Sequence, residues 1–134
     1  MSVPKEQRSK GTLNVNIEAR RLAVYTMRIT ANIKWFPADQ KDYTDRLRNA
    51  AVDIHTLCWL ANNIKADSAA HIMRRTQLQD RAAEKCNELA ALIELAKPLF
   101  HLTTKRCYFW IMKTNELRGM IRGWRDSDMQ RLTP

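Results

Sequence analysis

Apolar residues recur at alternating spacings of three and four positions along four long stretches of the chain. This spacing places them on one face of an α-helix, so each stretch predicts an amphipathic helix. The four helices are expected from about Asn14 or Asn16 to Trp35, from about Ala38 to Lys65, from Asp67 or Ser68 to Pro98, and from Thr103 or Thr104 to about Asp126. Phe36 and Pro37 end the first helix, because the residue before a proline avoids the helical conformation.

The apolar positions also predict which side of each helix is buried. In the first two helices they are Leu22, Tyr25, Ile29 and Ile33, then Leu47, Ala51, Ile54, Cys58 and Ala61. In the last two they are Leu78, Ala82, Cys86, Leu89, Ile93 and Ala96, then Cys107, Trp110, Thr114, Leu117, Ile121 and Trp124. Because the connections are short, consecutive helices should lie side by side, which predicts an all-α, up-down-up-down antiparallel four-helix bundle.

A chain of 134 residues fits one such domain. We expect the bundle to occupy residues 14–127, between a flexible basic N-terminal tail over 1–13 and a frayed C-terminus over 128–134. The tail has basic residues but no apolar segment, which is not the pattern of a signal peptide. No apolar run reaches the roughly 18 residues needed to cross a bilayer, so we expect a cytoplasmic protein without a membrane partner.

The first and last helices each have a second apolar stripe on the side away from the predicted core. This stripe consists of Ile17, Val24, Met27 and Ala31 in the first helix and of Phe109, Met112, Gly119, Met120 and Gly123 in the last. Two glycines one turn apart weaken a helix but let another backbone approach closely, although Gly123 could also simply weaken the helix end. The two stripes predict a homo-oligomer.

The net charge of +9 is concentrated on the same two helices. Arginines clustered on a rigid face suit a polyanion, since each phosphate that they neutralise releases bound counterions. The candidate nucleic-acid-binding residues are Arg118, Arg122, Arg125, Arg20, Arg21, Arg28, Lys105, Arg106 and Lys113. The alternative is a basic face that only keeps the protein in solution.

Nothing in the chain predicts catalytic chemistry. Cys58, Cys86 and Cys107 occupy ladder positions on three helices at different heights, and no cysteine or histidine pair has the spacing of a zinc site. His55, His71 and His101 lie apart, without the glutamate partners of a di-iron bundle. We therefore expect buried structural thiols, no metal, no cofactor and no enzyme activity.

Several short motifs, taken in order, resemble those of the Avd family, the accessory variability determinants of diversity-generating retroelements. More distantly, the chain resembles the four-helix proteins encoded in intervening sequences of bacterial ribosomal RNA genes. The matching residues are Phe36, Pro37, Tyr43, Arg46, Leu47, Ala50, Ala51, Leu57, Ala61, Asn62, Leu89, Leu92, Leu95, Ala96, Leu102, Tyr108 and the run from Asn115 to Trp124. Arg118 and Arg122 stand where the family ending usually has glycine, and Glu94 where arginine is common.

The resemblance implies a bacterial or phage-encoded, non-enzymatic basic bundle that forms a ring, with five subunits expected. Such a ring would bind the element's reverse transcriptase and its template RNA and support mutagenic cDNA synthesis. Two alternatives remain open from the residues themselves. One is a bundle that binds structured RNA without a reverse transcriptase, and the other is a protein-only adaptor; a neighbouring reverse-transcriptase gene and a nucleic-acid binding assay would distinguish them.

Overall fold

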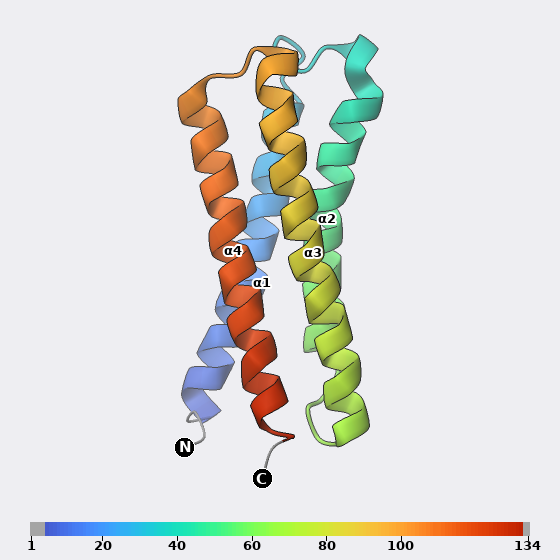
Figure 1. Ribbon diagram of the computed structural model, residues 1–134, viewed down its shortest axis with the longest axis vertical. Coiled ribbons are helices and arrows are strands. Elements are labelled where there is room, and N and C mark those ends of the chain that lie inside the picture. The colour runs from blue at the N-terminus through green and yellow to red at the C-terminus, as the bar shows by residue number, and fades with distance from the viewer. Residues whose placement is uncertain (1–4, 133–134) are drawn as a thin grey trace.

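Four long helices run along one axis in the computed structural model, which describes residues 5–132 and, for side chains, residues 14–132. They are α1 (Lys5–Thr30), α2 (Lys41–Asn62), α3 (Ala69–Phe100) and α4 (Thr104–Gln130), with a short 3-10 helix η1 (Ala38–Gln40) before α2. The α1–α2 and α3–α4 connections lie at one end of the bundle, and the α2–α3 connection lies at the other (Figure 1). The predicted all-α four-helix bundle is confirmed, and no strand occurs between residues 5 and 132.

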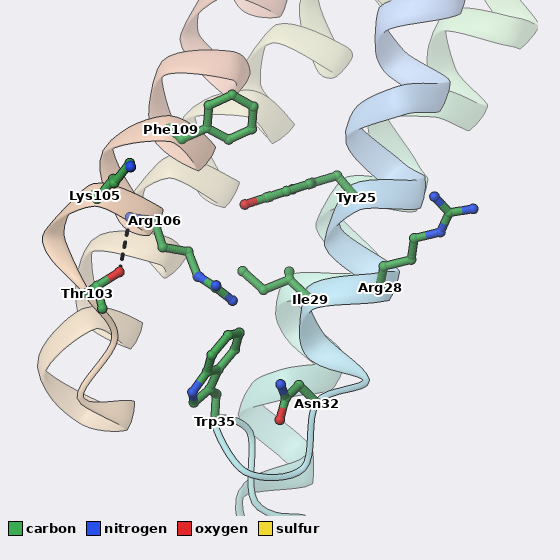
Figure 2. A pocket seen from close by; sticks show the side chains of 9 residues that line it. All are labelled: Tyr25, Arg28, Ile29, Asn32, Trp35, Thr103, Lys105, Arg106 and Phe109. Carbon is green, nitrogen blue, oxygen red and sulfur yellow. Dashed lines mark hydrogen bonds between the residues drawn. The ribbon is translucent and has the colours of Figure 1, made fainter.

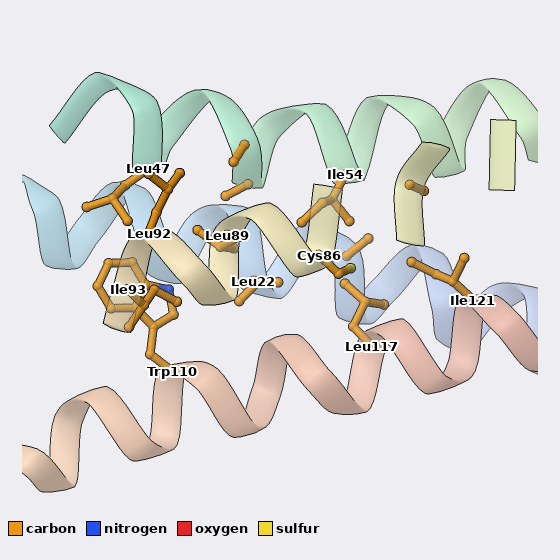
Figure 3. Close-up of a cluster of buried hydrophobic side chains, with 14 of the residues drawn as sticks. Leu22, Leu47, Ile54, Cys86, Leu89, Leu92, Ile93, Trp110, Leu117 and Ile121 are labelled. Atoms are coloured by element: carbon orange, nitrogen blue, oxygen red, sulfur yellow. The ribbon is translucent and has the colours of Figure 1, made fainter. Parts of the chain in front are cut away.

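The predicted ladders of α2, α3 and α4 form the centre of the core (Figure 3). All five predicted positions of α2 and all six of α4 are buried. Trp110 is the largest fully enclosed side chain, and its indole N–H donates to the Thr26 hydroxyl at 3.0 Å. This bond satisfies a polar group inside the core and joins α4 to α1. Thr26 was absent from the predicted ladder of the first helix.

Helix α1 differs from its predicted bounds at both ends. It begins at Lys5, within the segment expected to be a tail, while residues 1–4 lie outside the described part of the chain. It ends at Thr30 rather than Trp35, because Arg48 of α2 donates to the Thr30 carbonyl oxygen at 2.9 Å and to its hydroxyl at 2.8 Å. The guanidinium thus satisfies the Thr30 carbonyl oxygen, which a continuing helix would have paired with a later backbone amide. Ile33, predicted to be buried, is consequently 79% exposed.

Two of the predicted helix starts are confirmed by their capping bonds. Ser68 accepts a hydrogen bond from the His71 amide at 3.1 Å, and Thr103 accepts one from the Arg106 amide at 3.2 Å. Each hydroxyl satisfies a backbone donor that has no partner within its helix. Pro98 does not end α3, which continues two residues to Phe100 and stops where His101 adopts the left-handed conformation with φ of 56°.

The C-terminal part of α4 is more ordered in its contacts than a frayed end would be. Asp128 is 1% exposed and accepts hydrogen bonds from Arg75 Nε at 3.0 Å and from Gln79 Nε2 at 2.8 Å. Arg75 also donates to the Ile64 carbonyl oxygen, so one buried guanidinium joins α3, α4 and the α2–α3 connection. The helix therefore extends through Gln130, whereas the frayed segment was expected from residue 128; residues 133–134 lie outside the described part.

The three cysteines are buried and unpaired, as the ladders predicted. Burial raises the pKa of the Cys58 thiol and of the Cys86 thiol to about 12 in each case. With a pKa of about 12, only roughly one in ten thousand of these thiols is ionised at pH 8. Because the thiolate is the reactive form, both cysteines should react slowly. Between residues 5 and 132, no helix is long and apolar enough to cross a membrane.

This burial leads to a prediction about thiol reactivity. In the native protein, a disulfide reagent such as dithionitrobenzoate should label Cys58 and Cys86 no faster than the protein unfolds. The measurement is the absorbance of the released thiolate with and without guanidinium, where the denatured sample reports all three thiols. Rapid native labelling of either residue would contradict the core packing described above.

Candidate polyanion-binding surface

The nine basic residues predicted to bind nucleic acid fall into a paired and an unpaired group. Arg21 lies 2.7 Å from Glu18, Lys113 lies 3.6 Å from Glu116, and Arg125 lies 3.0 Å from Asp80. Each of these cations is partly neutralised within the chain. The other six have no ion-pair partner among the described residues, and they are Arg20, Arg28, Lys105, Arg106, Arg118 and Arg122.

The three arginines of α4 are therefore not equivalent, although their spacing in the sequence suggested one stripe. Arg125 also lies 3.4 Å from Asp126, so two carboxylates compensate its charge. Arg118 donates to the side-chain oxygen of Asn87, which is neutral and leaves the positive charge uncompensated. Arg122 is exposed to solvent. Arg118 and Arg122 are thus the cations of this face that remain available to an external anion.

On the other side of α4, a groove of about 610 Å³ opens between α4 and α1. The close-up shows Tyr25, Trp35 and Arg106 extending into this space, whereas the Arg28 side chain extends from α1 away from α4 (Figure 2). Its lining residues are Tyr25, Arg28, Ile29, Asn32, Trp35, Thr103, Lys105, Arg106 and Phe109. The groove exists because α1 and α4 are the least closely packed of the neighbouring helix pairs.

The groove brings together Arg28, Lys105 and Arg106, which the sequence placed on two separate helices. None of its aromatic residues was predicted to bind nucleic acid. Tyr25 was assigned to the core and Trp35 to the end of the first helix, and Phe109 was assigned to an outer stripe. Trp35 instead lies in a turn, where its amide and that of Phe36 both donate to the Asn32 carbonyl oxygen. The early end of α1 therefore directs Trp35 toward α4.

Arg106 and Trp35 form the floor of the groove. The guanidinium carbon of Arg106 lies 3.5 Å from the centroid of the Trp35 ring, which is a close cation–π contact. The Thr103 cap fixes Arg106 in the first turn of α4. Above them, the rings of Tyr25 and Phe109 meet edge to face with centroids 5.5 Å apart. Burial raises the pKa of Tyr25, and the nearby Arg106 charge partly opposes that rise.

A smaller pocket of about 270 Å³ lies next to the groove and shares Tyr25 and Phe109 with it. Its wall also includes Glu18, Arg21 and Lys113, so it contains a carboxylate and the ion pair that this carboxylate forms. The lining of the larger groove has three cations and no acidic residue. The formal charge of the lining is +3 in the larger groove and +1 in the smaller pocket, so an anion is favoured more strongly in the larger groove.

The predicted oligomer stripes are divided between exposed and packed residues. Val24 and Met27 are 40% and 43% exposed, and Ala31, Gly119 and Gly123 also face solvent. Ile17 and Met112 are partly buried, Met120 packs against the core, and Phe109 contacts Tyr25. The exposed large apolar residues of the stripes are thus Val24 and Met27 on α1 and Phe109, 41% exposed, on α4, while Met112 and Met120 of α4 are partly buried.

Within residues 14–132, no three histidine, cysteine or acidic side chains lie close enough together to hold a metal ion. The described surface therefore offers charge and aromatic contact rather than a cluster of ligands. Comparison with known proteins adds no assignment: no family model matches the chain, and no curated protein and no solved structure matches it significantly.

Proposed function

We propose that this protein is a non-enzymatic accessory factor of a diversity-generating retroelement. In this proposal, a homo-oligomer of the bundle binds the element's reverse transcriptase and its template RNA and supports mutagenic cDNA synthesis. The resemblance of the ordered motifs to the Avd family supplies the retroelement and the polymerase. The observation that supports RNA as a ligand is the set of six cations on α1 and α4 that have no carboxylate partner among the described residues.

These cations suit RNA because they are arranged on a rigid scaffold. The packed core already fixes the helix backbones that carry the arginines. Binding therefore orders only the arginine side chains and costs no backbone entropy. Arginine also matches the geometry of a phosphate, to which it can donate two parallel hydrogen bonds. Repetition of the same face around an oligomer would multiply weak contacts into stable binding.

The test of the full proposal is cDNA synthesis with purified components. The proposal requires a reverse-transcriptase gene beside this one. The product of that gene is incubated with its template RNA, with and without the protein, and the cDNA is sized on a denaturing gel. Extended cDNA should form only when the protein is present. RNA binding without any effect on the cDNA would favour a bundle that binds structured RNA alone, and the absence of RNA binding would favour a protein-only adaptor.

The oligomer is tested by a substitution on the exposed stripe of α1. Met27→Glu places a charge among apolar residues that would be covered in an assembly, so it should dissociate the oligomer while leaving helical content intact. Met73→Glu is the matched control, because Met73 is 45% exposed but lies on α3, outside the predicted interface. Light scattering after size exclusion gives the mass of each variant, and an intact Met27→Glu oligomer would remove this stripe from the interface.

Gly123→Leu tests the α4 side of the same interface. A Cβ atom added at Gly123 would meet nothing within 4 Å in the described structure, so the substitution should not disturb the fold of the subunit. It should instead favour the helix by up to about 1 kcal/mol, because glycine is a poor helix former. We expect a thermally more stable subunit that associates less well, whereas unchanged association would show that no backbone approaches α4 at Gly123.

A further inference from the structure

The groove between α1 and α4 has a property that phosphate binding alone does not require. Phosphate contacts need cations, yet three aromatic side chains line the groove beside its three cations, and they are Tyr25, Trp35 and Phe109. We propose that this groove binds one unpaired nucleotide of a single-stranded RNA segment. The inference rests on the proposed function, in that RNA is the ligand, and it adds which form of RNA is bound and where.

The size of the groove fits this ligand. A volume of about 610 Å³ lies within the range of sites that enclose a molecule the size of a nucleotide. A base within a duplex is stacked and paired, and it cannot enter a space between two helices. An unpaired base has a free face and a free edge, so it can leave the strand and enter the groove.

Arg106 and Trp35 supply the surface on which the base stacks. One face of the Arg106 guanidinium is held against the Trp35 ring at 3.5 Å, so the guanidinium is already oriented before any ligand arrives. Tyr25 extends from α1 toward this pair with its hydroxyl group facing α4 (Figure 2). Bases stack on both guanidinium planes and aromatic rings, and the space between Arg106 and Tyr25 offers both.

The remaining polar groups match the rest of a nucleotide. Arg28 and Lys105 are exposed at opposite walls of the groove, where they can contact the phosphates on either side of the stacked base. Asn32 has its side-chain oxygen engaged by the Lys34 amide at 3.0 Å, which leaves its NH₂ group to donate to a base carbonyl. The neighbouring pocket contains Glu18, which offsets one of its two cations, so the larger groove with three cations and no carboxylate is the preferred site.

The experiment uses the fluorescence of Trp35. Trp110 and Trp124 are only 0% and 9% exposed, so the Trp59→Phe variant leaves Trp35 as the accessible tryptophan. This variant is titrated at low salt with a single-stranded RNA, a duplex RNA of equal length, inorganic polyphosphate and polyglutamate. The single strand should quench the Trp35 emission, because a base stacked on the outer face of Arg106 lies next to the Arg106–Trp35 pair. The other three ligands offer no unpaired base and should leave the emission unchanged.

A matched pair of substitutions gives a second measurement. Trp35→Leu removes the ring that orients Arg106 beneath the base, so it should weaken single-strand binding about 5-fold or more and should change duplex binding less than roughly twofold. Trp59→Leu changes the same residue type at a 56% exposed position on α2 and should leave both affinities unchanged. Circular dichroism shows whether the Trp35→Leu variant folds. The quenching measurement uses the Trp59→Phe variant, so it does not depend on the folding of Trp35→Leu.

The outcomes separate this inference from the proposed function. If RNA binds without quenching Trp35, the groove is not the RNA-binding site, and the proposed function remains in place. Quenching by polyglutamate equal to that by RNA would overturn it in favour of an acidic peptide. Equal quenching by duplex and single strand would overturn the preference for an unpaired base, and a protein that binds no RNA at low salt would overturn both proposals.

Discussion

Asp128→Ala is expected to lower the free energy of unfolding by about 3–5 kcal/mol, because it leaves a buried guanidinium without its counter-charge. Arg75 is 7% exposed, and two of its nitrogens lie 3.0 and 2.9 Å from the Asp128 carboxylate. Gln79 would lose its acceptor as well. The measurement is urea unfolding followed by circular dichroism, at one fixed protein concentration because association would also contribute to stability.

The control for this prediction is Asp126→Ala. Asp126 is exposed and lies 3.4 Å from Arg125, so its removal should change the free energy of unfolding by less than about 1 kcal/mol. A double variant, Arg75→Met with Asp128→Leu, should recover part of the lost stability, because it removes the unpaired charge but leaves the Gln79 amide and the Ile64 carbonyl without their partners. If Asp128→Ala is as stable as Asp126→Ala, the C-terminal turns of α4 are not part of the core.

The second large effect concerns the unpaired cations. A variant with Arg20, Arg28, Arg118 and Arg122 replaced by glutamine should bind single-stranded RNA about 200-fold more weakly at 0.15 M salt. The slope of log affinity against log salt should become shallower by about 2.8, because each phosphate contact contributes about 0.7. The measurement is fluorescence anisotropy of a labelled RNA at several salt concentrations.

The matched control replaces arginines that already have partners. Arg21 and Arg125 pair with Glu18 and Asp80 at 2.7 and 3.0 Å, so the double glutamine variant removes charge that is partly neutralised. Its slope should change by less than the roughly 0.7 expected for one phosphate contact. Equal losses of RNA affinity in the two variants would mean that binding depends only on the net charge of the protein. An unchanged salt slope in the quadruple variant would show that its four arginines form only a solvated face.

The sequence was sufficient for the parts of the fold that depend on local pattern. Leu47, Ile54, Leu117 and Ile121 are buried as predicted, because large apolar residues at helical spacing have only one favourable side. The Ser68 and Thr103 caps were also predictable, since a hydroxyl before a helix can satisfy only nearby amides. These features need no knowledge of how the helices pack.

The buried polar residues were not predictable in the same way. Thr26 is buried because Trp110 donates to it across 84 positions of sequence, and Asp128 is buried because Arg75 reaches it across 53. Each residue alone resembles a surface position, and only its distant partner makes burial favourable. The predicted ladder of α3 therefore begins only at Leu78 and the end of α4 was expected to fray, although Arg75 and Asp128 are both buried.

The candidate site was predictable as a set of charges but not as a groove. Arg28, Lys105 and Arg106 were recognised individually from their residue type. Their convergence depends on how α1 and α4 are rotated about their axes, and the position of Trp35 depends on Arg48 ending α1 at Thr30. Neither has a signal in the local sequence. Aromatic residues at helical spacing are assigned to the core by default, which is why Tyr25 was not recognised as part of a site.

The mass of the protein with and without RNA tests most directly the claim that this bundle acts as an RNA-binding oligomer. Light scattering coupled to size exclusion should give a multiple of the 15.7 kDa subunit mass, and five subunits would have a mass of about 79 kDa. Added single-stranded RNA should increase that mass at low salt and dissociate at high salt. A species of 15.7 kDa whose mass RNA does not change would contradict both the assembly and the proposed ligand.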